Sequence, residues 1–344
     1  MTLRKLGVSL ISAAVASTLA VSAASAAEKW SMATPWSGGP IFEKAVKGVA
    51  KDISLLTGGA FDIEVFPGGT LGKSLKVSDI VRKGVAEMGH NWPGYDWGID
   101  RTSVVFGGFA GSMSGDIFSH WLYQGGGADL WMQWRTEKFN VADFPCSMGP
   151  REVFMHSHKR IETLADYKGV KMRTAGAWAE IAETLGASTV IMAGSEVYPA
   201  LERKVVDAIE WGGPHTNRVL GYEKIAKYII IPGIHQPMGA HECLVNMKVW
   251  KGLSAEQLTV MQMAGRLMVY DFFESEGHND AIAFTELMKG NNEIVDITEE
   301  FKEAGRKATA DWAAKQGTEN EWFAKVWQSQ VAYTEAWKFS SRYR

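Results

Sequence analysis

One stretch of the sequence, residues 168–236, constrains the fold more than any other. It contains two short apolar runs that each end in a polar residue, 170–172 before Arg173 and 205–209 before Glu210. Gly and Pro residues follow both runs, as they do where strands end in loops. Open α/β sheets bind ligands in a crevice at the carboxyl ends of their strands. The pattern therefore predicts an α/β domain that places a cation and a carboxylate beside one crevice.

The N-terminal segment has the pattern of an export signal. Arg4 and Lys5 precede a mostly apolar run over 6–21, and small residues up to Ala26 supply a cleavage site. We expect 1–26 to be a signal peptide that is cleaved near Ala26, with an uncleaved anchor as the alternative. No later run reaches the roughly 18 consecutive apolar residues that a membrane span needs. The sequence therefore predicts an exported, periplasmic protein.

Composition limits the remaining possibilities. Removing the signal takes away two positive charges, which moves the formal net charge from −3 to −5, so nothing favours nucleic acid as a partner. The rest of the chain is longer than one core comfortably supports, which predicts two lobes. Fourteen Trp residues are many for this length, and we expect some to face a cleft. Whether Cys146 and Cys243 form a disulfide or are two buried thiols stays open.

The order of patterns along the chain predicts how the lobes are built. Strand and helix patterns alternate, which indicates mainly parallel sheets with helices on their faces. Ser254 is a helix cap, and a helix from there to about 288 would extend roughly 45–50 Å at about 1.5 Å per residue, enough to span both lobes. The expected divisions are lobe I over 27–152 with a strand at about 241–250 returning to it, lobe II over 153–240, the long helix over 254–289, and a C-terminal helical tail over 290–344.

Several segments carry a resemblance to a known family. They are TLADYKGVKMR (163–173), EVYPALERKVVDAIEWGGP (196–214), AKYIIIPG (226–233), WLYQGGGADL (121–130) and NWPGYDWGID (91–100). In this order they resemble the solute-binding proteins of TRAP transporters, particularly the subgroup of sodium–pyruvate (2-oxo acid) and calcium–lactate binders. The resemblance implies an α/β, two-lobed periplasmic binding protein with a central sheet in each lobe, hinge strands and a long helix spanning both lobes. It also implies closure over one small organic anion and delivery to membrane subunits driven by an ion gradient.

Arg173 is the strongest candidate for contact with a ligand. A guanidinium at a strand end can hold a carboxylate through two parallel hydrogen bonds, a geometry that Lys cannot supply. The resemblance places the family's substrate-carboxylate arginine at this position. The alternative is a salt bridge between the lobes.

Glu210 and Trp211 match the family's Glu-Trp pair beside a bound cation. Glu210 offers carboxylate oxygens and Trp211 a backbone carbonyl, and hard cations such as Na⁺ and Ca²⁺ prefer such oxygen ligands. The alternative for Glu210 is a buried pair with Arg173 alone. We expect Na⁺ or Ca²⁺ to bind with the ligand, and no organic cofactor.

Glu152 and Gln236 complete the expected cation set, and they show an exchange. The pyruvate-binding relatives carry Gln ahead of the arginine, where this chain has Glu152, and a second Glu where this chain has Gln236. If both residues point inward, two carboxylates and one amide still surround the cation. The hypothesis is that the charge facing the cation is unchanged but has moved across the cleft.

Other candidates have weaker support. Trp36, Tyr95 and Trp178 are expected to line the ligand site. Glu242 lies on a strand that could face the cleft, but it matches no motif, so we expect it at the surface or the hinge. Four histidines show no metal-ligand spacing such as HExxH and are expected to be ordinary polar residues: His156, His158, His235 and His241.

These features predict a binding subunit without catalysis, which captures a small 2-oxo or 2-hydroxy acid by lobe closure. An aromatic or other monocarboxylate bound by Arg173 without metal is the alternative ligand. A subunit that presents its ligand to a membrane sensor is the alternative role. An exported metal-dependent hydrolase is disfavoured because no nucleophile–base arrangement is visible. The resemblance also allows a homodimer through an exchanged C-terminal helix.

Overall fold

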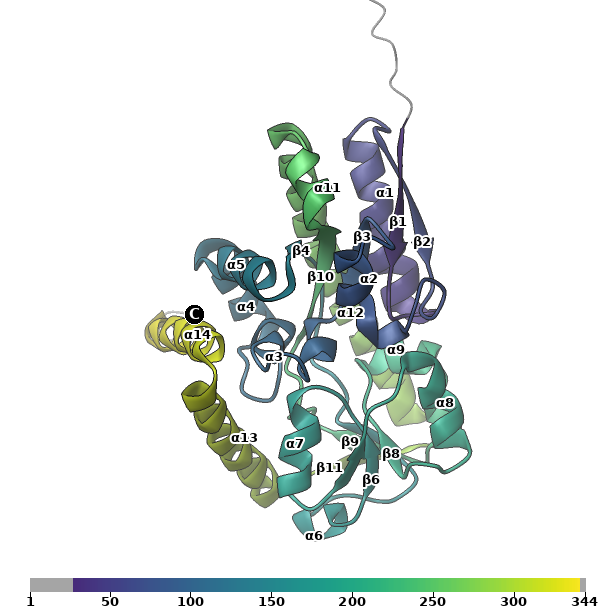
Figure 1. Cartoon of the computed structure of the whole chain (residues 1–344). Coiled ribbons are helices and arrows are strands. Elements are labelled where there is room, and N and C mark those ends of the chain that lie inside the picture. Colours follow the sequence, from purple (N-terminus) through teal and green to yellow (C-terminus); the bar gives the residue numbers. More distant parts are fainter. Residues whose placement is uncertain (1–26, 341–344) are drawn as a thin grey trace, which may run out of the picture.

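The computed structural model describes residues 27–340, which form two lobes, each built on one sheet (Figure 1). The expected signal peptide, 1–26, lies outside these residues. The first sheet comprises β1 (Glu28–Ala33), β2 (Phe61–Phe66), β3 (Met88–Asn91), β4 (Val141–Gly149) and β10 (Gly239–Asn246). The second comprises β5 (Met155–Ser157), β6 (Lys171–Arg173), β7 (Ser188–Val190), β8 (Ala208–Ile209), β9 (Tyr228–Ile231) and β11 (Glu293–Asp296). The strand orders are β2–β1–β3–β10–β4 and β11–β9–β5–β8–β6–β7.

Each sheet is parallel except for one strand, and that strand has just crossed over from the other lobe. β10 runs antiparallel to β3 and β4, and β5 runs antiparallel to β8 and β9. The chain enters each lobe from the side of the cleft, so the crossing strand has to run against its neighbours. The carboxyl ends of the other strands consequently face the boundary between the lobes, where open α/β sheets place ligands.

Fourteen α-helices cover the two sheets in the described part of the chain. Those of the first lobe are α1 (Lys47–Leu56), α2 (Val77–Arg82), α3 (Ser103–Gly107), α4 (Gly115–Gln124), α5 (Gly127–Phe139) and α11 (Met247–Gly252). Those of the second lobe are α6 (Leu164–Tyr167), α7 (Ala177–Thr184), α8 (Gly194–Glu202), α9 (Pro214–Val219) and α10 (Tyr222–Ile225). The last three are α12 (Ala255–Lys289), α13 (Glu299–Glu319) and α14 (Glu321–Ser340). None of the helices within 27–340 is both long and apolar enough to cross a bilayer.

The expected long helix is present as α12. Ser254 caps it and forms a reciprocal capping box with Gln257, which satisfies backbone donors at its first turn. The helix packs on β4 and α1 in the first lobe and on α9 in the second, so it spans both. α13 and α14 then cover one side of the molecule, α13 against α6 and α7 of the second lobe and α14 against α3, α4 and α5 of the first (Figure 1).

One element differs from expectation. Residues 293–296, which the sequence placed in the helical tail, form β11 and pair with β9 at the edge of the second sheet. Four residues of mixed polarity fit the first turn of a helix as well as a strand. Pairing with a strand some 65 residues earlier in the chain decides the outcome, and no local pattern contains it.

A disulfide joins the two strands of the first lobe that lead to and from the crossovers. Cys146 on β4 and Cys243 on β10 are bonded, with their Cα atoms 5.6 Å apart. Both lie in the apolar core between the first sheet and helices α1 and α12. This resolves the pairing that the sequence left open.

Candidate functional site

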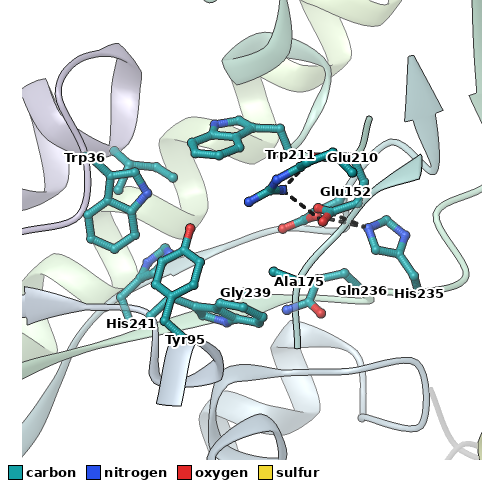
Figure 2. A pocket seen from close by; sticks show the side chains of 13 residues that line it. Trp36, Tyr95, Glu152, Ala175, Glu210, Trp211, His235, Gln236, Gly239 and His241 are labelled. Carbon is teal, nitrogen blue, oxygen red and sulfur yellow. Dashed lines mark hydrogen bonds and ion pairs between the residues drawn. The ribbon is translucent and has the colours of Figure 1, made fainter. Parts of the chain in front are cut away.

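One cavity between the lobes is lined by seven of the eight side chains that the sequence assigned to the ligand and cation site (Figure 2). They are Trp36, Tyr95, Glu152, Arg173, Glu210, Trp211 and Gln236. Most of them stand at or just after the carboxyl end of a strand, as the topology requires. Their roles stay predictions, but their convergence in one place is a property of the structure.

Arg173, the last residue of β6, is held by Glu210. Its Nη1 donates to the Glu210 carbonyl at 2.9 Å and to the Glu210 Oε1 at 3.0 Å. Both residues belong to the second lobe, so the ion pair does not bridge the lobes as the sequence-based alternative supposed. The Trp211 ring centre lies 5.0 Å from the guanidinium carbon. The buried Nε of Arg173 has no acceptor among the described residues, which leaves donor capacity for a ligand.

His235 joins two of the predicted carboxylates. Its Nε2 lies 3.1 Å from the Glu152 Oε2 and 3.8 Å from the Glu210 Oε2. Burial by itself would lower the pKa of His235, but its hydrogen bond with Glu152 and its attraction to the Glu152 and Glu210 carboxylates outweigh burial and raise the pKa to about 9. Burial raises the pKa of Glu152 to about 7. For Glu210, burial is opposed by the Arg173 guanidinium, and the pKa is lowered.

The expectation that His235 is an ordinary polar residue is therefore wrong. Its ring is 3% exposed, and together with Glu152 and Glu210 it offers three possible metal-ligand atoms within 4.8 Å of one another. No ligand spacing marks it in the sequence. Its position directly before Gln236 was the one available signal.

Gln236 lies on the same crossover, between β9 and β10. Its Nε2 donates to the Gly107 carbonyl at 3.1 Å and to the Met238 carbonyl at 2.8 Å. Because the nitrogen is occupied, the amide oxygen is the atom that can accept a hydrogen bond or contact a cation. The contact with Gly107 also ties this crossover to α3 of the first lobe.

The first-lobe wall of the cavity is aromatic. Trp36, Tyr95 and His241 face the charged cluster across it (Figure 2). Burial raises the pKa of Tyr95 to about 12 and lowers the pKa of His241 to about 3, so both are neutral at pH 7. His241 was also expected to be an ordinary polar residue, and its place in the wall corrects that view.

Glu242 is neither at the surface nor at the hinge. It is fully buried in the first lobe and forms an ion pair with Arg135. The Trp131 indole donates to it at 2.9 Å. Arg135 also pairs with Asp96 at 2.8 Å, the residue after Tyr95, so this buried network fixes the turn that positions Tyr95. The strand alternation could not identify Arg135 and Trp131 as partners because both come from α5, more than 100 residues earlier in the chain.

Trp178 does not line the cavity. It is buried behind it, where its indole donates to the Tyr167 hydroxyl at 3.2 Å and packs on Phe154 and His235. The prediction of a wall residue is wrong because α7 turns this face toward the core of the second lobe. Trp178 supports His235 from behind.

Comparisons with known proteins agree with this architecture. The family model for the bacterial extracellular solute-binding proteins of family 7 matches residues 32–320. A monocarboxylate 2-oxoacid-binding periplasmic protein of Nostoc sp. (strain PCC 7120) is 30% identical over 335 residues, which cover 94% of this chain and 89% of that protein.

Solved structures show the same fold. A TRAP transporter solute-binding protein from Bordetella bronchiseptica RB50, with calcium and picolinate, superposes with a TM-score of 0.88 at 24% identity, covering 92% of this chain and 95% of that one. A TRAP periplasmic solute-binding protein from Pseudoalteromonas atlantica T6c, with sodium and pyruvate, gives 0.86 at 27% identity, covering 92% and 97%.

These matches confirm the resemblance and the two-lobed α/β fold. Proteins of this family are periplasmic receptors that bind small organic acids and work with the membrane subunits of TRAP transporters; they are not enzymes. The chain belongs to the bacterial extracellular solute-binding proteins of family 7.

Proposed function

We propose that this receptor captures a short-chain 2-oxo or 2-hydroxy monocarboxylate together with a cation. Arg173 carries the proposal: it lines the cavity, is 2% exposed, and has a buried Nε without an acceptor. A buried donor without a partner costs about 1–3 kcal/mol, and a carboxylate ligand removes that cost. The 2-oxoacid-binding relative from Nostoc supports the same class of ligand.

The size of the cavity favours a short acid. It leaves about 50 Å³ for the centre of a water-sized sphere. Since one water needs at least about 10–15 Å³ by this measure, the space accepts roughly four water-sized groups. Pyruvate and lactate are among the smallest 2-oxo and 2-hydroxy acids, so they need the least further room.

The residues beside Arg173 fit a hard cation. Glu152 and Glu210 supply carboxylate oxygens, and their ligand atoms lie within the 4.8 Å cluster that also includes His235. The amide oxygen of Gln236 and the backbone carbonyl of Trp211 would complete an oxygen-rich set of the kind that Na⁺ and Ca²⁺ prefer. A bound ion would supply a positive charge for the ligand's carboxylate and its adjacent oxygen. The neighbours with sodium and pyruvate or calcium and picolinate support this assignment.

Lobe closure is the expected mechanism. The lobe limits that we propose are 27–152 with 241–250, and 153–240, with the crossovers at Glu152 and His235–Gln236 as hinges. These crossovers carry part of the cation set, so ligand and cation contact both lobes and the hinge at once. Binding would thereby shift the equilibrium toward the closed state.

An aromatic monocarboxylate held without metal is the second candidate ligand, because three indole side chains line the cavity: Trp36, Trp92 and Trp211. A thermal-shift panel of pyruvate, lactate, benzoate and picolinate, each with EDTA, Na⁺ or Ca²⁺, separates the candidates. A true ligand at about 100 times its Kd adds roughly 2.7 kcal/mol of stability. Stabilisation by pyruvate or lactate only with a cation supports the proposal; stabilisation by benzoate regardless of cation supports the alternative. If none of the acids stabilises the protein, both are wrong.

Two finer features accompany this function. Residues 1–26 are proposed to be a signal peptide removed near Ala26, which N-terminal sequencing of the exported protein tests.

Self-association through α14 is proposed because Val331 and Phe339 on this helix are 41% and 77% exposed. If light scattering finds a dimer, Val331→Ser and Phe339→Ser together should shift it to monomer; a monomeric wild type overturns the proposal.

A further inference from the structure

Three buried polar side chains, one in the first-lobe wall and two behind it, are linked to one another and belong to neither the carboxylate partner nor the cation set. Ser147 on β4 stands between two imidazoles: its Oγ is 2.8 Å from the His241 Nδ1 and 3.0 Å from the His90 Nε2. All three residues are at most 6% exposed. Trp36 packs edge-on against both rings, with centroids 5.1 Å from His241 and 5.0 Å from His90, so the rings are held in place.

The single hydroxyl proton of Ser147 restricts how the protons are arranged. If Ser147 donates to the His241 Nδ1, then His90 donates its Nε2–H to Ser147. The His90 Nδ1, which has no partner, then carries no proton. In the reverse arrangement, Ser147 donates to the His90 Nε2 and accepts from the His241 Nδ1. This would leave a buried N–H on His90 without a partner and require the less stable Nδ1–H tautomer on both rings. Buried N–H groups are rarely left unpaired. The first arrangement is therefore favoured, and it puts the proton of His241 on Nε2.

The Nε2 of His241 is the end available to the cavity. His241 lines the cavity, and within 27–340 the one hydrogen bond of its ring is the one that Nδ1 makes. Nε2 is not among the buried atoms that lack a partner, so it keeps some accessible surface. Because burial lowers the pKa of His241 to about 3, the ring presents a neutral N–H rather than a charge.

We propose that His241 is a specificity-determining residue that donates its Nε2–H to an acceptor oxygen on the part of the ligand remote from the carboxylate, with Ser147 and His90 as positioning residues. The inference rests on the proposed function, and it narrows the ligand class. It favours short 2-oxo acids with a hydroxyl or carbonyl oxygen on the third carbon over those that end in a methyl group.

A matched pair of acids tests this. 3-Hydroxypyruvate and 2-oxobutyrate have nearly the same shape and differ by a terminal hydroxyl in place of a methyl group. Titration calorimetry of the mature protein with Ca²⁺ or Na⁺ should give a preference of about fivefold or more for 3-hydroxypyruvate, the range of one net hydrogen bond. His241→Phe should remove the preference while 2-oxobutyrate still binds, and His156→Phe, a buried histidine away from the cavity, should keep it.

¹⁵N NMR spectra of the imidazoles test whether Ser147 and His90 set the tautomer of His241. The wild type should show the Nε2–H tautomer at His241, and Ser147→Ala should give a mixture of tautomers and a smaller preference. If neither acid binds the wild type, the proposed function fails. If both bind equally well, or if the wild-type His241 carries its proton on Nδ1, this inference is overturned and the proposed function stands. The wild-type measurements decide this even if His241→Phe does not fold.

Discussion

The two walls of the cavity differ in charge. The second lobe and the crossovers contribute Arg173, Glu210, Glu152 and His235, which are already paired with one another. The lining residues from the first lobe are aromatic, apolar or neutral, including His241. Removing charges from water is costly even when they pair. A moving wall without charges avoids that cost at each closure, so the division suits a receptor that holds the ligand's head on one side and encloses it from the other.

The largest expected effect is on the charged wall. Arg173→Met should weaken pyruvate binding by about 3–5 kcal/mol, because it removes the carboxylate partner and leaves Glu210 unpaired. Titration calorimetry with cation present measures it. Lys171→Met, an exposed change on the same strand, is the control for the loss of a positive charge. An Arg173→Met protein that is folded by circular dichroism and binds within threefold of wild type would show that the charged wall does not hold the ligand.

The next effect concerns the scaffold of the uncharged wall. The disulfide closes a loop with a sequence separation of 97, and Cys146→Ala with Cys243→Ala should lower the free energy of unfolding by about 3–4 kcal/mol. Urea denaturation measures this. Because neither sulfur lines the cavity, pyruvate affinity should stay within about threefold. Equal stability of the wild type and the double variant would refute the prediction.

Exchanging Glu and Gln between positions 152 and 236 tests whether one carboxylate can serve the expected cation from either position. Glu152→Gln should weaken cation-dependent pyruvate binding by roughly 1.5–3 kcal/mol, the range for contacts to charged groups. Adding Gln236→Glu should restore most of it, because the pair then has the arrangement that the resemblance implies for pyruvate binders. Calorimetry at several Ca²⁺ concentrations compares the single and double variants. Failure of the second change to rescue the first would mean that the two positions do not share one ion.

The smallest effect concerns a neutral group within the second lobe. Burial lowers the pKa of His156 to about 3, against about 6.5 in the unfolded chain. Between these two pKa values the unfolded chain binds a proton on His156 that the folded state excludes. The stabilisation from the neutral His156 ring is therefore complete above pH 6.5 and is lost as the pH falls from there toward 3. At pH 5.5 the loss is about 1.4 kcal/mol.

His156→Phe should remove that loss. The difference in unfolding free energy between the variant and the wild type should grow by this amount from pH 7.5 to 5.5, measured by urea denaturation. His278→Ala, a change at an exposed histidine, is the control for the loss of an imidazole. A constant difference between variant and wild type at both pH values would contradict the assignment.

How far the sequence predicts the structure depends on the range of the contacts involved. Ser254 and its helix are predictable because capping and periodicity are local. The seven cavity residues were found because strand ends and family motifs mark them. His235, His241 and the pairing of Arg135 with Glu242 were missed since each depends on groups brought together from distant segments. β11 and the inward turn of Trp178 were missed for the same reason.

The indoles of the cavity have a practical consequence. Trp36 comes from the first lobe and Trp211 from the second, and Trp92 directly precedes the turn that contains Tyr95. Entry of an acid should displace water from these rings and place a negative charge beside the guanidinium that Trp211 faces, and both changes should shift the indole emission. Intrinsic tryptophan fluorescence can therefore report ligand binding without a label. Rapid-mixing experiments would follow the rate of capture as a change on top of the constant emission of the other tryptophans.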